Sequence, residues 1–289
     1  ASDVYKRQFI HDMEAVCPNA LFINYTNPMA MITGAIQRVS SIPSIGLCHS
    51  VQVCVPDLMR QLGMEYDSTV QYKIAGINHQ AWLLEVSKNG VDLYPEIKRR
   101  SLEQGAPPYD RVRHEMMHKF GYYITESSEH TSEYLPYFIK SAHPELIERF
   151  NIPLDEYPRR CIAQIEDWKH RRELLVSEHK LEHVRTHESA SYVLESMVYS
   201  RVYKLGGNVL NHGLITNLPQ DACVEVPCLI DASGVQPVVV GDLPPQLAAL
   251  NRTNINPQLL TIEAALTGKK EYIYHACLLY TSDAADDLI

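Results

Sequence analysis

The sequence lacks the features that mark several large classes of protein. No apolar run approaches the roughly 20 residues that a membrane-spanning helix needs. The formal net charge is −9, and no block of lysine or arginine is present to bind nucleic acid or an anionic membrane. We find no secretory signal, repeat or low-complexity tract. We therefore expect a cytoplasmic protein whose partners include neither a membrane nor a nucleic acid.

The chain also lacks a disulfide framework and a phosphate-binding glycine loop. Its 7 cysteines are irregularly spaced, which is typical of reduced cytosolic thiols. A Gly-x-Gly-x-x-Gly loop follows the first strand of a dinucleotide-binding fold. No such loop occurs here, and Gly206-Gly207 lacks its spacing. The residues by themselves therefore indicate no pyrophosphate site.

What is present predicts an α/β protein. The chain has 289 residues, of which 45% are apolar, enough for one large domain or two modest ones. A helix, a strand, a helix and a second strand follow one another early in the chain, which is a βαβ pattern and implies a parallel sheet. We expect these elements at 9–16, 20–25, 27–39 and 45–48.

The later part of the chain predicts an α+β region built around an antiparallel sheet. Its expected strands are 70–75, 81–87, 208–211, 223–230 and 235–240. Its expected helices are 111–120, part of 122–138, 158–181, 187–201 and 244–266. We therefore expect two regions, 9–50 and 51–276. Residues 1–8 and 277–289 resemble translated sequencing-adapter or assembly scars, with ordinary frayed termini as the alternative.

Two strand ends carry side chains suited to a metal ion. Cys48 follows one apolar run, and His79 follows another. A thiolate and an imidazole bind soft or borderline metals, and open α/β sheets place their chemistry in loops at strand ends. Taken alone, Cys48 reads as a small buried hydrophobe and His79 as a turn histidine bonded to backbone.

Polar residues beside these strands are candidates for substrate and proton chemistry. His49 could donate or accept a proton, because an imidazole group ordinarily titrates near neutrality; the alternative is that it makes only an orienting hydrogen bond near the metal. Asn24 and Asn27 lie at a strand-to-helix junction, where an asparagine can bond a sugar hydroxyl or a cofactor. Capping the helix is the alternative for Asn27.

The segment 125–134 is dense in proton-transfer groups. On a helix, His130 and Tyr134 share one face, with Glu126 a turn before them and Glu129 nearby. A tyrosinate near a divalent cation can act as a base. The alternative is a solvated polar helix.

Taken in order, several runs resemble the NAD- and manganese-dependent glycoside hydrolase family four, most closely its α-galactosidase (melibiase) branch. The similarity spans about residues 9–276. It implies the C-terminal remnant of a Rossmann-type parallel sheet, followed by an α+β domain like that of lactate and malate dehydrogenases. The matching runs are NYTNPMAM (24–31), GLCHSVQ (46–52), AGINH (75–79), TESSEH (125–130), NLP (217–219) and VEVP (224–227).

The resemblance also implies a mechanism. NAD⁺ would oxidise C3 of an α-galactoside such as melibiose, a base would remove the C2 proton, and the leaving group would be eliminated. Water would then add and the hydride would return, with Mn²⁺ on the C2 and C3 oxygens. Cys48 and His79 would bind the metal. Asn24 is our candidate for cofactor binding and Asn27 for substrate binding.

His49 would protonate the leaving group in this scheme. Tyr134 is our choice for the C2 base, with Glu126 and Glu129 as rivals. Because the family's nucleotide-binding strands and glycine loop are not in the chain, we expect an inactive fragment of an enzyme whose relatives form dimers or tetramers. The alternatives are a family member acting on α-glucosides, galacturonides or 6-phosphoglycosides, a lactate/malate dehydrogenase-like oxidoreductase, and a non-catalytic metal- or sugar-binding module.

Overall fold

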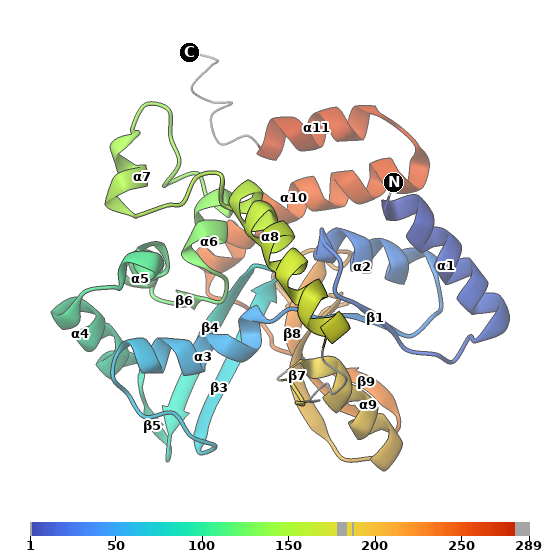
Figure 1. The fold of residues 1–289 in the computed structure, drawn as a ribbon, viewed down its shortest axis with the longest axis horizontal. Helices are drawn as coiled ribbons and strands as arrows, with labels where there is room; N and C mark the ends of the chain where they lie inside the picture. The colour runs from blue at the N-terminus through green and yellow to red at the C-terminus, as the bar shows by residue number, and fades with distance from the viewer. Residues whose placement is uncertain (1, 178–183, 187, 281–289) are drawn as a thin grey trace.

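The computed structural model describes residues 2–177, 184–186 and 188–280 (Figure 1). β1 (Phe22–Asn24) and β2 (Ser44–Gly46) are parallel neighbours joined by α2 (Met29–Val39). Parallel strands need such a crossover, because the chain must return to the same end of the sheet. The βαβ prediction is therefore confirmed.

The remaining strands extend the same sheet in antiparallel fashion. The described residues form a 9-stranded sheet in the order β1-β2-β7-β8-β3-β4-β5, with β6 beside β4 and β9 beside β8. The predicted α/β fold class is confirmed, and one sheet joins the two regions. The boundary at residue 50 stays a prediction. The added strands are β3 (Val70–Ile77), β4 (Gln80–Lys88), β5 (Val91–Asp92), β6 (Tyr123–Ile124), β7 (Tyr203–Leu210), β8 (Cys223–Asp231) and β9 (Gly234–Pro237).

Helices cover both faces of this sheet (Figure 1). α10 and α11 pack against each other near α2, and α3 to α5 gather around β3 and β4. Besides α2, the described helices are α1 (Ser2–Val16), α3 (Ser50–Gln61), α4 (Tyr94–Gln104), α5 (Arg111–Phe120), α6 (Ser128–Tyr134), α7 (Glu145–Arg149), α8 (Glu156–Ser177), α9 (Ser189–Tyr199), α10 (Pro245–Thr267) and α11 (Glu271–Tyr280), with the 3₁₀ turn Pro108–Asp110 before α5.

Some predicted boundaries differ from the structure. α1 begins at residue 2 rather than 9, and α11 continues to residue 280. Residues 178–181 of one predicted helix and residue 187 of another lie outside the described residues, as do residues 1 and 281–289. The interpretation of 1–8 and 277–289 as scars stays a prediction.

The start of β7 was predicted five residues too late. Gly206 and Gly207 lie within this strand, although glycine disfavours strands on its own. A Cβ on Gly207 would lie 2.5 Å from Ile45 Cδ1, and one on Gly206 would lie 2.7 Å from Val51 Cγ1. The glycine pair therefore belongs to the sheet because neighbouring side chains approach its backbone closely.

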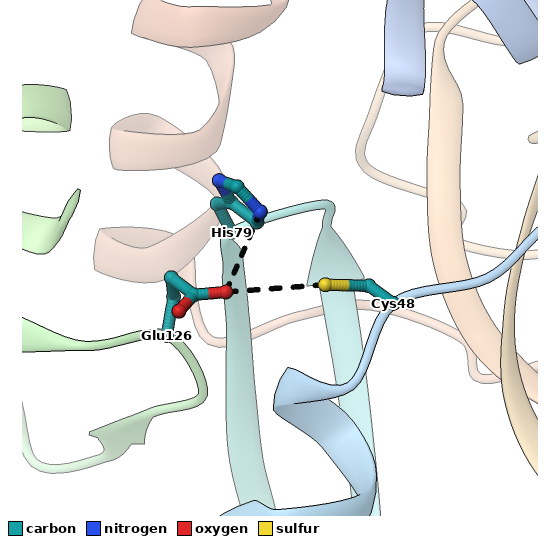
Figure 2. A group of neighbouring side chains, drawn as sticks. All are labelled: Cys48, His79 and Glu126. Atoms are coloured by element: carbon teal, nitrogen blue, oxygen red, sulfur yellow. Dashed lines mark hydrogen bonds and ion pairs between the residues drawn. The ribbon is translucent and has the colours of Figure 1, made fainter. Parts of the chain in front are cut away.

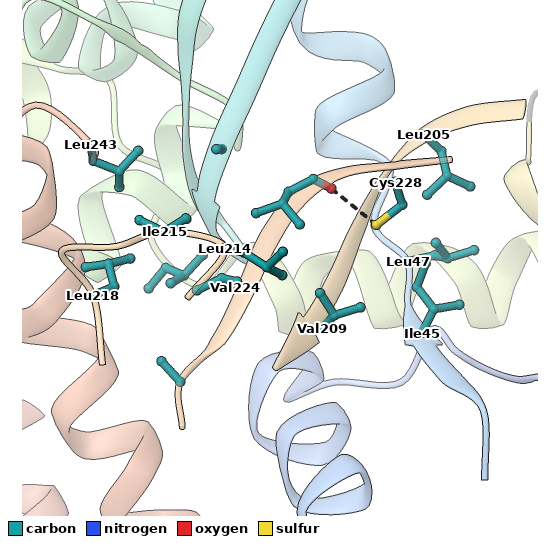
Figure 3. Close-up of a cluster of buried hydrophobic side chains, with 14 of the residues drawn as sticks. Ile45, Leu47, Leu205, Val209, Leu214, Ile215, Leu218, Val224, Cys228 and Leu243 are labelled. Carbon is teal, nitrogen blue, oxygen red and sulfur yellow. Dashed lines mark hydrogen bonds between the residues drawn. The ribbon is translucent and has the colours of Figure 1, made fainter. Parts of the chain in front are cut away.

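The core follows the strand periodicity. In β4, Ala81 and Leu83 join one buried cluster while Trp82 between them joins another, since successive side chains point to opposite faces. Around β2, β7 and β8 a further cluster holds Ile45 and Val224 (Figure 3). This packing fixes the strand ends that carry the polar residues described below.

Six of the cysteines, at positions 17, 48, 54, 161, 223 and 228, are free thiols, as predicted. Burial raises the pKa of Cys54 and of Cys228 to about 12. Among the described helices, none combines the length and apolar character needed to cross a bilayer.

Candidate functional site

Cys48 and His79 lie at the ends of two strands of the sheet. Cys48 comes two residues after β2, and the backbone N–H of Leu47 still donates to Asn24 O at 3.0 Å. His79 occupies the two-residue turn between β3 and β4 with a left-handed φ of 64°. Such a conformation is uncommon for a residue with a side chain and often marks a functional turn.

A carboxylate joins these two residues. Glu126 Oε2 lies 3.9 Å from Cys48 Sγ and 3.4 Å from His79 Nε2 (Figure 2). The three possible ligand atoms all lie within 4.8 Å of one another. The backbone N–H of Ser127 donates to Glu126 Oε1 at 2.9 Å, so the other oxygen is left facing the sulfur and the imidazole. We call these three residues the strand-end cluster.

The donor set of the strand-end cluster fits a divalent cation. Thiolate and imidazole suit borderline metals, and a carboxylate suits harder ions such as Mn²⁺. All three side chains are half-buried, which shields an ion while leaving positions open to a ligand. The sequence prediction paired Cys48 with His79, and the structure brings both together with Glu126.

The segment around α6 lies beside this cluster. Ser127 caps the helix by accepting from the backbone N–H of His130 at 3.3 Å. The rings of His130 and His79 stack with centroids 5.1 Å apart, and the ring of Tyr134 lies 5.8 Å from that of His79. The prediction that His130 and Tyr134 share a face is confirmed.

The prediction that Glu126 forms the preceding helical turn is wrong, because α6 begins at Ser128. Glu126 instead lies in a bend between β6 and α6, and from there its carboxylate faces Cys48 and His79. Glu129 instead gathers with His130 and Glu133 in a second group. Burial raises the pKa of the Glu129 carboxyl.

His49 lies next to the cluster but faces solvent. It precedes α3, its side chain is 60% exposed, and its Nε2 pairs with Glu188 before α9. Its ring centroid lies 6.4 Å from that of Tyr25. The structure thus leaves His49 accessible and gives it a carboxylate partner.

The two asparagines of the first junction differ. Asn24 is buried, and its Nδ2 donates to Thr33 Oγ1 at 3.0 Å while its Oδ1 accepts from the N–H of Thr26. Asn27 is exposed and is followed by a cis peptide bond to Pro28. The alternative of Asn27 as a helix cap is wrong, because Pro28 occupies the cap position and no side chain bonds there.

Sequence reasoning missed a buried polar pair beside the cluster. Glu225 and Asn208 face each other across β8 and β7, and Asn208 Nδ2 donates to Glu225 Oε1 at 3.0 Å. Burial raises the pKa of the Glu225 carboxyl well above its ordinary value, and the charge of nearby Cys48 adds to the rise. One acidic residue inside the otherwise apolar strand 223–228 was the available signal.

Comparison with known proteins agrees with this architecture. Residues 6–64 match the family 4 glycosyl hydrolases, and residues 74–280 match the family 4 glycosyl hydrolase C-terminal domain. The chain is 58% identical over 276 residues to an alpha-galactosidase of Bacillus subtilis, covering 95% of this chain and 64% of the relative. The chain thus spans a little less than two thirds of that relative's length.

Solved structures show the same fold. A 6-phospho-alpha-glucosidase from gut microorganisms, in complex with NAD and Mn²⁺, superposes with a TM-score of 0.74 at 22% identity, covering 99% of this chain and 68% of that one. A malate dehydrogenase of Plasmodium falciparum superposes with a TM-score of 0.52 at 14% identity, covering 94% and 72%. The likeness to malate dehydrogenase confirms that part of the fold prediction.

The fold and the site together define an α/β protein of dehydrogenase-like architecture, with a cluster of possible metal ligands at its strand ends. The matches over residues 6–64 and 74–280 are more specific. The chain belongs to glycosyl hydrolase family 4.

Proposed function

We propose that this chain is part of an enzyme that hydrolyses α-galactosides, with NAD and Mn²⁺ as cofactors. The observation that carries the proposal is the strand-end cluster, Cys48, His79 and Glu126, in a family 4 chain. The 58% identity to the Bacillus subtilis alpha-galactosidase supports galactosides over the other sugars of the family. The proposed substrate is therefore a small-molecule α-galactoside such as melibiose.

The cluster is our proposed site for the cation. Cys48 Sγ, His79 Nε2 and Glu126 Oε2 would hold Mn²⁺, which as a Lewis acid would polarise sugar oxygens and stabilise negative charge on them. This gives Glu126 the role of a ligand rather than of a base.

Proton transfer then falls to neighbouring side chains. Tyr134, whose ring lies 5.8 Å from that of His79, is our proposed base for the sugar C2 proton. His49 is our proposed acid for the leaving group, since its imidazole is exposed and paired with the carboxylate of Glu188. Asn27 is exposed shortly after the end of β1 and would form a hydrogen bond with a sugar hydroxyl. Glu129 stays a rival base, because its raised pKa suits proton exchange.

The residues present do not by themselves fit NAD. β1 and β2 are followed by 25–28 and 47–50, neither of which is a glycine-rich loop. Asn24 stays our proposed cofactor contact, although both ends of its amide already bond within the chain.

We further propose a cytoplasmic, homodimeric or homotetrameric enzyme. Six free thiols, together with the irregular spacing of all 7 cysteines, support a reducing compartment. The oligomeric state rests on the family resemblance. Size-exclusion chromatography with light scattering tests it, and a monomer of the active enzyme would contradict it.

The test joins this chain to the parts of the Bacillus subtilis relative that it does not match. Hydrolysis of nitrophenyl α-galactoside is expected, with loss of activity on omission of NAD⁺ or Mn²⁺. Hydrolysis only of the 6-phosphorylated substrate would favour a 6-phosphoglycosidase instead. Net accumulation of NADH during turnover would favour a dehydrogenase, because a glycosidase that restores C3 returns its hydride.

A further inference from the structure

β2 and β3 lead to Cys48 and His79, and each is paired at one position with the antiparallel strands β7 and β8 that lie between them. Among the described residues, β2 pairs with β7 at Gly46 opposite Asn208. Likewise, β3 pairs with β8 at Gly76 opposite Glu225. Asn208 and Glu225 are themselves opposite each other in the β7–β8 ladder. A single row therefore crosses four strands, from the one that leads to Cys48 to the one that leads to His79.

Only the two central members of this row carry side chains. Residues directly opposite each other in neighbouring strands point to the same face of a sheet. Asn208 Nδ2 lies 3.0 Å from Glu225 Oε1 and 3.5 Å from Gly46 O, so one amide links the β2 backbone to a carboxyl on β8. A Cβ on Gly46 would lie 3.0 Å from Asn208 Cβ, and one on Gly76 would lie 2.6 Å from Gln80 O. Gly46 thus leaves room for Asn208, while Gly76 leaves room for the backbone of β4 on the other side of β3.

This pair is buried close to the cluster. Asn208 and Glu225 are 0% and 1% exposed. The charges of Cys48, His79 and Glu126 all act on the Glu225 carboxyl. Within the described structure, Asn208 Oδ1 and Glu225 Oε2 are buried without a hydrogen-bond partner. Buried polar atoms without partners are rare in folded proteins and usually have a functional reason.

We propose that Asn208 and Glu225 are positioning residues of the cation site: the Asn208 amide ties the β2 backbone to the Glu225 carboxyl on β8, and this link orients the strand ends that place Cys48 and His79. The inference rests on the proposed role of the strand-end cluster as a cation site. Groups around the ligands of a metal site orient those ligands, and their loss typically weakens binding by roughly 10- to 100-fold. In the otherwise apolar strand 223–228, the Glu225 carboxyl accepts a hydrogen bond from the Asn208 amide.

Co²⁺ is the probe for this inference, because a thiolate bound to Co²⁺ gives a charge-transfer absorption. The metal-free, reduced chain is titrated with Co²⁺, and the absorption reports both affinity and geometry. We expect the band in the wild type and its loss in Cys48→Ser. A wild type without the band, or a Cys48→Ser chain that keeps it, would refute the proposed cation site itself.

Three variants then test the positioning role. Glu225→Ala and Asn208→Ala each break the link, and we expect Co²⁺ affinity to fall by roughly 10- to 100-fold. Glu225→Gln keeps an oxygen that accepts from Asn208 Nδ2, so we expect affinity within about threefold of wild type and an unchanged spectrum. This rescue separates positioning from a need for the carboxylate charge.

Asn211→Ala is the matched control. Asn211 is equally buried near β7, but its amide bonds Ile215 O and Leu218 O in the loop that follows. We expect this variant to lose thermal stability while its affinity for Co²⁺ stays that of the wild type. If the alanine variants at 208 and 225 do not fold, Asn208→Ser, which also lacks the amide, takes their place.

Three results would overturn the inference. The first is that folded variants without the Asn208–Glu225 link bind Co²⁺ as tightly as the wild type. The second is that Glu225→Gln loses as much affinity for Co²⁺ as Glu225→Ala. The third is that Asn211→Ala weakens Co²⁺ binding as much as Glu225→Ala and Asn208→Ala.

Discussion

The buried carboxyl of Glu225 makes the stability of the metal-free chain depend on pH. In the unfolded chain this group ionises around its ordinary value of 4.5, and burial raises its pKa well above that value in the folded chain. Its contribution to stability is fully present below the unfolded pKa and is lost as the pH rises through the folded pKa. Between the two values the folded chain holds one more proton, so the free energy of unfolding falls with pH.

The size of this effect follows from the single proton. The free energy of unfolding falls by about 1.4 kcal/mol per pH unit while the folded carboxyl stays protonated. A loss of this size per pH unit is a substantial part of a typical total stability of about 5–15 kcal/mol. Glu225→Gln is neutral at every pH and lacks this decline.

Urea unfolding followed by circular dichroism measures the effect. Wild type and Glu225→Gln are compared at about pH 5, 6 and 7 with a reductant and a chelator, because other titrating groups cancel in the difference between them. A difference that stays constant with pH would refute the reasoning. Added Mn²⁺ should make the decline shallower in the wild type, since a nearby cation favours the ionised carboxyl.

Three further predictions test the base and the packing. Tyr134→Phe in the enzyme completed from the Bacillus subtilis relative should lower kcat by roughly 10²- to 10⁴-fold with little change in KM; steady-state kinetics showing a kcat within threefold of wild type would exclude Tyr134 as the base. Arg113→Met should cost about 3–5 kcal/mol in urea unfolding, because it leaves the fully buried Asp110 without its ion-pair partner. The exposed Arg111→Met is the control, and equal losses in both would contradict this account. Gly207→Ala should cost about 1–3 kcal/mol by overpacking β7, whereas an unchanged melting temperature would show that its neighbours can move aside.

Local patterns were enough to predict the elements that begin the sheet. The apolar runs of β1 and β2, separated by a helix of 11 residues, lead to a parallel pair by the geometry of the crossover alone. The same pattern located Cys48 and His79 at strand ends. Both predictions depend on neighbours in sequence, and both hold in the structure.

Elements that depend on distant packing were missed or misplaced. α4 buries Tyr94, Ile97 and Ser101, a helical spacing that its many charges obscure. β6 consists of two residues, and its pairing with β4 supplies its strand character. Gly206 and Gly207 belong to β7 through their pairing with Pro227 and Val226 of β8, and the close approach of Val51 and Ile45 leaves no room for a side chain there.

The sequence by itself determined the parallel βαβ start, the antiparallel remainder and the residues Cys48 and His79, since hydrophobic period and strand ends are local properties. Tertiary structure decided that Glu126, 47 positions after His79 in the numbering, lies 3.4 Å from it. It also decided that Glu225 and Asn208 pair between the two strands of the site. These contacts arise from the order of strands in the sheet, which long-range pairing sets.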